Sequence, residues 1–354
     1  MSSSPSPAAV IEVAGLSKQY RVHKREAGLR AAIASLFHRK YETVDAVADL
    51  SFAIAAGERV GFLGPNGAGK TTTLKVLAGL LHPTAGQVRV AGFVPQAREA
   101  AFLKRITLVM GQKQQLLWDL PPVETFALNR AVYDIPRKQF EETLGELTEL
   151  LEIAPVMTKP TRQLSLGERM KCELCAALLH RPEVLFLDEP TIGLDVSMQL
   201  TVRSFIRRYN ERFGATVLLT SHYMDDVAAL CPRVVVIDKG RLRYDGRLDD
   251  LVQTMRPEKR IVVRLGQRVA ASDLGGLGRL VENEDTRAVF QVAQADVRET
   301  MAALLGRLPI VDLTVEDPPL EEVMSEVFAS GRAPAPTPGP ASSPTPAPTE
   351  ERAS

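Results

Sequence analysis

The chain has 354 residues, and its 43 Lys and Arg residues balance its 43 Asp and Glu residues. This length predicts one large domain with a small one, or two of medium size, and a hydrophobic content of 45% is typical of a globular protein. The balanced charge provides no overall attraction to nucleic acid, no apolar run reaches the roughly 18 residues of a membrane span, and three cysteines do not build a disulfide framework. We therefore expect a protein of a reducing, cytoplasmic compartment.

The N-terminal part of the chain predicts a leader, a strand and a basic helix. Residues 1–9 have neither the basic start nor the apolar block of a secretory signal, so we expect a disordered leader. Residues 11–22 alternate well enough for a strand. Residues 21–40 are rich in Lys, Arg and His and carry an apolar helical face. This stretch is either a solvated helix packed on the domain or a contact for acidic lipid headgroups.

The middle of the chain alternates strands with helices. Residues 47–64 predict two short strands around a turn at Ala56-Gly57, and residues 137–152 and 197–212 predict helices. Three further segments are almost continuous in Val, Leu and Ile and predict strands buried on both faces of a sheet: 184–189, 216–222 and 233–240.

A break near residues 255–257 predicts a second unit. Residues 256–330 contain three strand-like and two helix-like segments, which indicates a small α+β module. Its composition does not decide between regulation, dimerisation and cargo binding. Residues 331–354 are rich in Pro and poor in large apolar side chains, so we expect a disordered tail.

The sequence GPNGAGKT matches the pattern of a phosphate-binding loop, between a predicted strand and a predicted helix. Glycine lets the backbone turn so that its N–H groups point at phosphate oxygens, the Lys reaches the β- and γ-phosphates, and the Thr hydroxyl ligates magnesium. A dinucleotide loop is disfavoured because G-x-G-x-x-G is absent. The expected nucleotide-binding residues here are Gly64, Pro65, Asn66, Gly67, Ala68, Gly69, Lys70, Thr71 and Thr72.

Polar residues follow two of the buried strands. Asp188 and Glu189 are costly at such a position unless they are used, so we expect Asp188 to hold magnesium through water and Glu189 to orient the attacking water. His222 is either structural or a contact of the γ-phosphate that holds the acid. Asp195 is either a helix N-cap or a bridge to a partner chain.

Taken together, these motifs resemble the nucleotide-binding subunits of ABC transporters over roughly residues 10 to 250. The resemblance rests on GPNGAGKTT, the Gln of VMGQKQQL, LSLGE, VLFLDEP, GLD and the SH of TSH, in the order of that family. It implies an α/β fold: a P-loop NTPase core of the ABC ATPase type, with a mixed sheet and flanking helices. The ATPase domain would span residues 10–254, with a helical subdomain at about 112–180, and the α+β module would follow.

The family resemblance also implies how ATP and Mg²⁺ are bound. Two copies would pack head to tail, and the turn LSLGE of one copy would face the ATP held by the other. Its residues in trans would be Ser165, Leu166, Gly167 and Glu168. Leu166 and Glu168 depart from the Gly and Gln of the family pattern, whereas Ser165 and Gly167 keep the positions of the backbone contacts.

Further site residues follow from the resemblance. An aromatic side chain would stack on adenine, and Tyr20 fits best, with Tyr41 as the alternative. Gln112 would ligate magnesium and sense the permease. Lys70, Glu189 and His222 would be the catalytic residues, and Asp195 would bridge the dimer.

The function implied is that of an ATPase subunit, a peripheral protein on the cytoplasmic face of the cell membrane. Its partners would be a second copy and a separate multi-span permease, and export is the expected direction, because LSLGER and the stretch after Gln112 resemble a bacterial subgroup of polysaccharide and antibiotic exporters. An ATPase acting on nucleic acid or ribosomes is the alternative. Residues 72–163 lack the heptads of the DNA-repair members and the chain has one cassette, so we expect no nucleic acid.

Two features have alternative interpretations. Cys172 and Cys175 form C-x-x-C inside a predicted helix without a second pair for zinc, which favours buried packing thiols. Trp118 is either a contact with the permease or part of the core.

Overall fold

The computed structural model describes residues 9–23, 41–111, 113–255, 257–270, 274–276 and 278–330. Gln112 and residues 24–40, which make up most of the expected basic helix, lie outside the described residues. So do residues 1–8 of the expected leader and the expected tail from residue 331.

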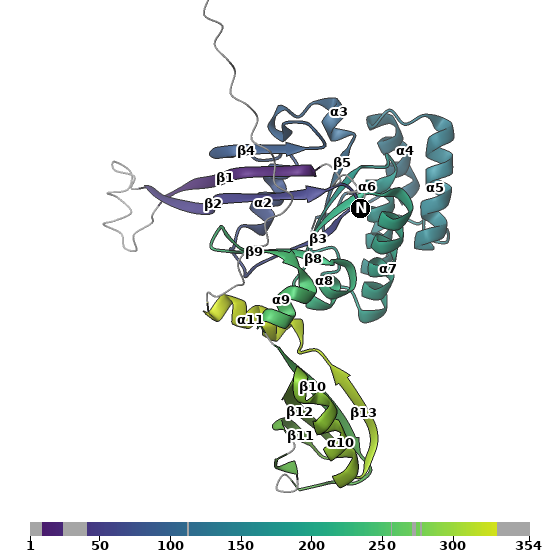
Figure 1. Cartoon of the computed structure of the whole chain (residues 1–354). Helices are drawn as coiled ribbons and strands as arrows, with labels where there is room; N and C mark the ends of the chain where they lie inside the picture. The colour runs from purple at the N-terminus through teal and green to yellow at the C-terminus, as the bar shows by residue number, and fades with distance from the viewer. Residues whose placement is uncertain are drawn as a thin grey trace, which may run out of the picture.

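A six-stranded sheet forms the centre of the fold (Figure 1). Its order is β5-β6-β7-β3-β8-β9, with parallel pairing up to β8 and an antiparallel β9 at the edge. The strands are β3 (Arg59–Leu63), β5 (Ile106–Met110), β6 (Val184–Asp188), β7 (Thr216–Thr220), β8 (Arg233–Asp238) and β9 (Arg241–Arg247). The mixed sheet confirms the expected fold class.

Both faces of this sheet are buried, which explains the nearly continuous apolar strands. Successive side chains of a strand point to opposite faces. Phe186 accordingly belongs to one core cluster, whereas Leu185 and Leu187 belong to another. The first cluster lies under α2 (Lys70–Leu77), and the second lies under α7 (Val196–Phe213) and α8 (Met224–Leu230), among other elements.

A second sheet covers the α2 side of the core. It has the order β2-β1-β4 and consists of β1 (Ala9–His23), β2 (Tyr41–Ala55) and β4 (Ala85–Val90), all antiparallel. Its inward residues, such as Ile11 and Ile54, are fully buried. After β4 come the short helices η1 (Pro95–Ala97) and α3 (Ala100–Leu103).

A helical layer lies at the β5 side of the central sheet (Figure 1). It contains α4 (Pro122–Val132), α5 (Arg137–Leu151), η2 (Thr161–Gln163) and α6 (Leu166–Leu178). Helix α6 contacts α4, α5 and β5, so it connects this layer to the sheet. Its Cys172 and Cys175 are free and buried, which confirms them as packing thiols.

The C-terminal part has its own antiparallel sheet, in the order β11-β12-β10-β13, and its own hydrophobic cluster. After α9 (Leu248–Met255) it comprises β10 (Glu258–Leu265), β11 (Arg279–Glu284), β12 (Arg287–Ala293), η4 (Gln294–Asp296), α10 (Val297–Arg307), β13 (Ile310–Glu316) and α11 (Leu320–Ser330). The last helix, α11, lies within the predicted module of residues 256–330, but it packs on the ATPase part. Its Val323, Met324 and Val327 are buried in the core of the ATPase part, against α8 and α9.

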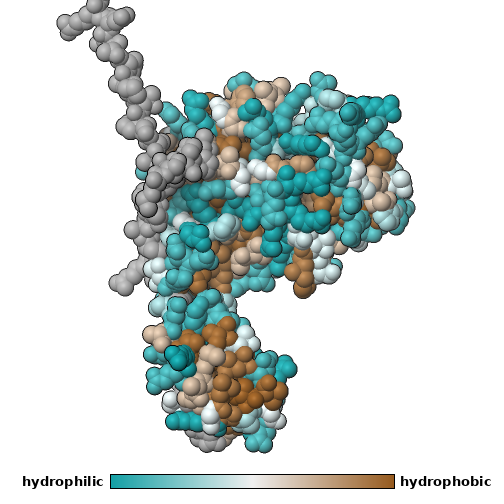
Figure 2. All heavy atoms as spheres, turned by 45° about the vertical axis from the view of Figure 1, so that its right-hand side comes forward, coloured by the Kyte–Doolittle hydropathy of each residue, from teal (hydrophilic) through white to brown (hydrophobic). Residues whose placement is uncertain are grey.

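The surface differs between the two parts. Figure 2 shows apolar side chains gathered on the C-terminal sheet module, where Leu305 and Val311 are 58% and 70% exposed. Among the described residues, no helix has both the length and the apolar character needed to cross a membrane.

Candidate nucleotide-binding site

The phosphate loop, residues 64–71, connects β3 to α2 in a tight turn that requires glycine at two positions. A Cβ on Gly64 would lie 2.3 Å from the carbonyl oxygen of Ile237. Gly69 has φ +104°, and a Cβ there would lie 2.4 Å from the carbonyl oxygen of Ala46. Any side chain at either position would collide with backbone. The loop is therefore fixed between β8 and β2, and its last two residues, Lys70 and Thr71, form the start of α2.

Lys70 is bent back onto its own loop. Its Nζ donates to the carbonyl oxygens of Gly64 at 2.6 Å and Pro65 at 3.2 Å. The side chain is largely buried, and this burial lowers its pKa, while Glu189 and Asp188 act in the opposite direction. An ammonium group held by neutral carbonyls is available to a stronger anionic partner such as a phosphate.

Asp188 ends β6 beside the first turn of α2. The hydroxyl of Thr71 donates to Asp188 Oδ2 at 3.0 Å, and the hydroxyl of Thr220 donates to Oδ1 at 2.7 Å. The sequence did not single out Thr220, although its place at the end of the buried segment TVLLT was a usable signal. A hydroxyl beside a carboxylate is a donor set of hard oxygens, which fits Mg²⁺.

Glu189 follows Asp188 at a sharp change of direction, with φ +58°. Such a conformation is uncommon for a residue with a side chain and is maintained only by its surroundings. Here the backbone N–H of His222 donates to Oε2 at 3.0 Å, and His222 Nε2 lies 3.4 Å from Oε1. Burial raises the pKa of Glu189, and the two contacts with His222 oppose that rise. The carboxylate is thus both oriented and made more basic.

These residues surround one cavity of about 510 Å³. The structure brings together most of the residues that the sequence predicted, and adds Ala46, Lys75, Met110 and Lys113 to the lining. The predicted residues in the lining are Asn66, Gly67, Ala68, Gly69, Lys70, Thr71, Thr72, Asp188, Glu189 and His222. The cavity therefore joins a phosphate loop, a pair of acids and a histidine.

Other predicted residues stand next to the cavity or outside it. Gly64 and Pro65 lie behind Lys70 as its acceptors. Tyr20 is 36% exposed, and the centroid of its ring lies 5.2 Å from Lys18 Nζ. In the β1–β2 ladder it pairs with Val44, which is two residues before Ala46 of the cavity lining. Neither Gln112 nor the side chain of Tyr41 is among the described residues.

The signature turn, residues 164–168, is not part of this cavity's described lining. Ser165 caps α6: its hydroxyl accepts from the N–H of Glu168 at 3.2 Å, and the Glu168 carboxylate accepts from the N–H of Ser165 at 2.8 Å. Leu166 is 39% exposed, and Gly167 packs against Met198, where a Cβ would collide.

Asp195 likewise lies outside that lining and caps a helix. Its carboxylate accepts from the backbone N–H of Met198 at 2.9 Å, at the start of α7. The N-cap interpretation is therefore confirmed, and it is compatible with a second contact to a partner chain.

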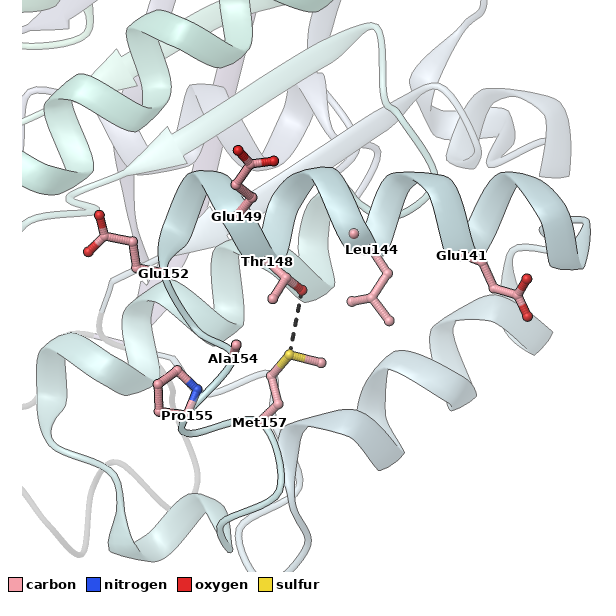
Figure 3. Close-up of a pocket in the computed structure, with 9 residues that line it drawn as sticks. Glu141, Leu144, Thr148, Glu149, Glu152, Ala154, Pro155 and Met157 are labelled. Carbon is pink, nitrogen blue, oxygen red and sulfur yellow. Dashed lines mark hydrogen bonds between the residues drawn. The ribbon is translucent and has the colours of Figure 1, made fainter.

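A larger hollow, of about 850 Å³, lies between α5 and the segment 152–157 that follows it. Figure 3 shows Thr148 and Met157 facing each other there, with the Thr148 hydroxyl 3.5 Å from the Met157 sulfur. Besides the Thr148 hydroxyl, the polar side chains of the lining are carboxylates such as Glu141 and Glu149. It offers no cation to a phosphate, so size does not identify the nucleotide site.

The similarity to known proteins agrees with this geometry. Residues 47–192 match the family described as "ABC transporter". The chain is 35% identical over 222 residues to the ABC transporter ATP-binding protein NatA of Bacillus subtilis. The aligned region covers 63% of this chain and 90% of NatA. The chain belongs to the family of ABC transporter ATP-binding subunits. As a member of that family it is an ATPase, and the cavity at the phosphate loop is its candidate ATP site.

The similarity of this ABC subunit extends into the C-terminal part. Residues 257–316 match the family "EvrA-like ABC transporter, C-terminal domain". The daunorubicin resistance ATP-binding protein DrrA3 of Streptomyces coeruleorubidus is 33% identical over 296 residues, 82% of this chain and 92% of DrrA3. A solved structure described as a dimeric post-hydrolysis state of the ATP-binding cassette MJ0796 with ADP and Pi has a TM-score of 0.55 at 21% identity, covering 67% of this chain and 98% of that one. At this identity the last comparison establishes the fold.

Proposed function

We propose that this ABC subunit hydrolyses ATP as half of a head-to-tail homodimer and thereby drives a separate membrane permease. The observation that carries the proposal is the separation of its two anion-binding turns. The cavity contains the phosphate loop and the acids, but residues 164–168 do not contribute to its described lining. The N-terminus of α6, which can bind an anion, is therefore available to an ATP that another copy holds.

Each residue of the cavity has a role in this proposal. Lys70 leaves the carbonyls of Gly64 and Pro65 and binds the β- and γ-phosphates. Glu189 accepts a proton from the attacking water, since burial makes it a better base and His222 fixes its orientation. Ser165 and Gly167 of the second copy face the γ-phosphate, and Asp195 meets that copy beside them. Hydrolysis removes the γ-phosphate contact and lets the two copies separate.

Magnesium is proposed at Thr71 and Asp188, whose oxygens already lie within 3.0 Å of each other. Among the described residues no group of three His, Cys, Asp or Glu side chains forms a metal cage. This fits Mg²⁺, which takes one or two protein oxygens and completes its shell with water and phosphate. When bound, the ion neutralises charge on the phosphates. We assign Gln112 to the same site from its motif, and Tyr20 or Tyr41 to adenine.

The permease is proposed to dock beside α3 and β5. A cavity of about 540 Å³ there is lined by apolar Leu80, Val132 and Tyr133 and by the cations Arg98 and Lys104. It also includes Gln114 and Gln115, so a partner seated in it would contact the segment after Gln112. Trp118, 48% exposed, lies in that segment and fits a partner contact better than a core position.

We place the protein on the cytoplasmic face of the membrane and propose export as the direction. The similarity to DrrA3 supports export, because a protein named for drug resistance fits a system that removes its cargo.

The proposal is tested with Glu189→Gln, which removes the base and preserves the shape of the side chain. With ATP and Mg²⁺ this variant should form a stable dimer by light scattering, and ATP turnover should fall by about 10²- to 10⁴-fold. With ADP it should remain monomeric. A Glu189→Gln variant that binds ATP but stays monomeric at every concentration tested would refute the dimer.

A further inference from the structure

Asp226, in the first turn of α8, is a fully buried carboxylate whose two oxygens are both hydrogen-bonded. Arg203 of α7 donates from its Nε to Oδ1 at 2.5 Å. The hydroxyls of Thr191 and Ser221 both donate to Oδ2, the second of them at 2.6 Å. One side chain therefore joins two helices and two loop segments.

The two hydroxyls that bind Asp226 lie next to the proposed catalytic pair of Glu189 and His222. Ser221 directly precedes His222 in the chain, and Thr191 follows Glu189 by two residues. Inside the cavity, these two loop segments meet in the hydrogen bond from the His222 N–H to Glu189 Oε2. Asp226 links the same two segments a second time, outside the described lining of the cavity.

The backbone of Glu189 needs support from its surroundings, because its φ of +58° is uncommon for a residue with a side chain. The N–H of Glu189 donates to the carbonyl oxygen of Thr220 at 3.1 Å, which fixes the start of the turn. Two residues later, the hydroxyl of Thr191 attaches the turn to α8 through Asp226. The turn is thus held on both sides of the residue with the uncommon conformation.

An ion pair as deeply buried as that of Asp226 and Arg203 is weak evidence for stability. Both groups have lost most of their hydration, and apolar side chains of similar volume often pack such a position equally well. Hydrogen bonds differ from apolar contacts in having preferred lengths and angles. A carboxylate with three such bonds therefore holds its partners in one arrangement, which gives a reason for its presence beside the catalytic pair.

We propose that Asp226 is a positioning residue of the ATPase reaction: it holds the segments of Thr191 and Ser221 so that Glu189 stays aimed at the attacking water. The inference rests on the proposed function, because it needs Glu189 as the base. Asp226 acts through the two segments, since it lies outside the described lining of the cavity. Without its hydrogen bonds, ATP binds as before, but the carboxylate of Glu189 no longer meets the water in the productive orientation.

Three variants isolate the hydroxyl of Thr191. Thr191→Val removes its hydrogen bond and preserves the shape of the side chain, whereas Thr191→Ser retains the hydroxyl. Thr143→Val is the matched control, because Thr143 is a fully buried threonine of α5 whose hydroxyl has no hydrogen-bond partner among the described residues. We expect Thr191→Val to lower kcat by about 10- to 100-fold, as for other small misplacements of a reacting group, and to change KM for ATP less than about twofold. Thr191→Ser should retain most of the parent kcat, and Thr143→Val should retain all of it.

A second comparison repeats Thr191→Val in the Glu189→Gln background. If Asp226 acts through Glu189, the added substitution should lower the residual turnover by less than about twofold, because the effects of residues that act as a unit do not add. A further loss of about tenfold or more would show damage that does not pass through Glu189, and it would overturn the positioning role. Equal kcat values for Thr191→Val and Thr143→Val would overturn it as well. A Glu189→Gln variant with the turnover of the parent would instead contradict the proposed function.

Discussion

Lys70 shows how the site is arranged before a nucleotide binds. It is almost fully buried, its pKa is lowered by that burial, and its hydrogen bonds go to two carbonyls of its own loop. A cation with neutral partners in a low-dielectric environment gains more from a phosphate than a solvated lysine does.

Replacement of Lys70 by Ala should therefore weaken ATP binding by roughly 10- to 100-fold, the value of hydrogen bonds between charged groups. Lys138→Ala, which removes an exposed lysine on α5, is the charge-matched control and should leave the affinity unchanged. Nucleotide titration followed by fluorescence or calorimetry gives both affinities. An unaltered ATP affinity in Lys70→Ala would show that the lysine does not meet the phosphates.

The residues that the sequence could predict are those whose chemistry forms a contiguous motif. Gly64 to Thr72 and Asp188-Glu189 each carry their pattern within a few positions, and the structure brings most of them to one cavity. Thr220 could not be found this way. It is a single polar residue in an apolar segment, and its importance comes from its hydrogen bond to Asp188, which is distant in the sequence.

At the scale of elements, the start of α6 explains one departure from the family pattern. Glu168 replaces a Gln, and its carboxylate closes a reciprocal cap with Ser165. The hydrogen bond from the Ser165 N–H lowers the pKa of Glu168 below its usual 4.5. The added charge thus serves the helix N-terminus, where negative charge is favourable.

Glu168→Ala should lower stability by up to about 1 kcal/mol at pH 7, as for other lost caps. Because the pKa of Glu168 is lowered in the folded protein, its stabilisation is present above about pH 4.5 and is lost as the pH falls through the lowered pKa. Urea unfolding at pH 7 and below pH 4.5 should show the difference from the parent narrowing at the lower pH. Glu168→Gln, which keeps a neutral acceptor, should lose less. A difference that grows on acidification would contradict this cap.

The strands that sequence patterns missed include edge strands with polar residues. Strands β4 and β11 read AGQVRV and RLVENE, and most of their residues are exposed or half-buried. Such strands are held by backbone hydrogen bonds to a neighbouring strand. Their alternation between apolar and polar residues is short, so a search for that alternation does not detect them. The buried strands β6, β7 and β8 have the opposite character and could be predicted well.

At the scale of the whole molecule, α11 ties the C-terminal part to the ATPase part. Three of its side chains are buried in the ATPase core, and Arg260 of β10 forms an ion pair with Glu322 at 2.6 Å. A domain boundary predicted from composition alone would assign this helix to the C-terminal module. Its apolar face instead completes the cover over α8 and α9.

Two truncations distinguish these regions. Removal of residues 333–354, which are rich in Pro and poor in large apolar side chains, should leave ATPase activity and Tm unchanged. Removal of residues 319–354 should lower stability by several kcal/mol, since burial of each large apolar side chain contributes about 1.5–3 kcal/mol. Thermal unfolding and ATPase assays measure both. Equal Tm values for the two truncations would mean that α11 contributes nothing to the core.

The most direct test of the proposed shared ATP site is a cross-link between two copies. Asn66→Cys and Ser165→Cys are made separately in the Glu189→Gln background and mixed. The three native cysteines are buried, so the new thiols react first. With ATP and Mg²⁺, oxidation should produce a disulfide-linked pair of chains of twice 38.7 kDa, and ADP should give far less. A Ser165→Cys thiol that stays as reactive with ATP as without it, and never links to the second copy, would contradict the account.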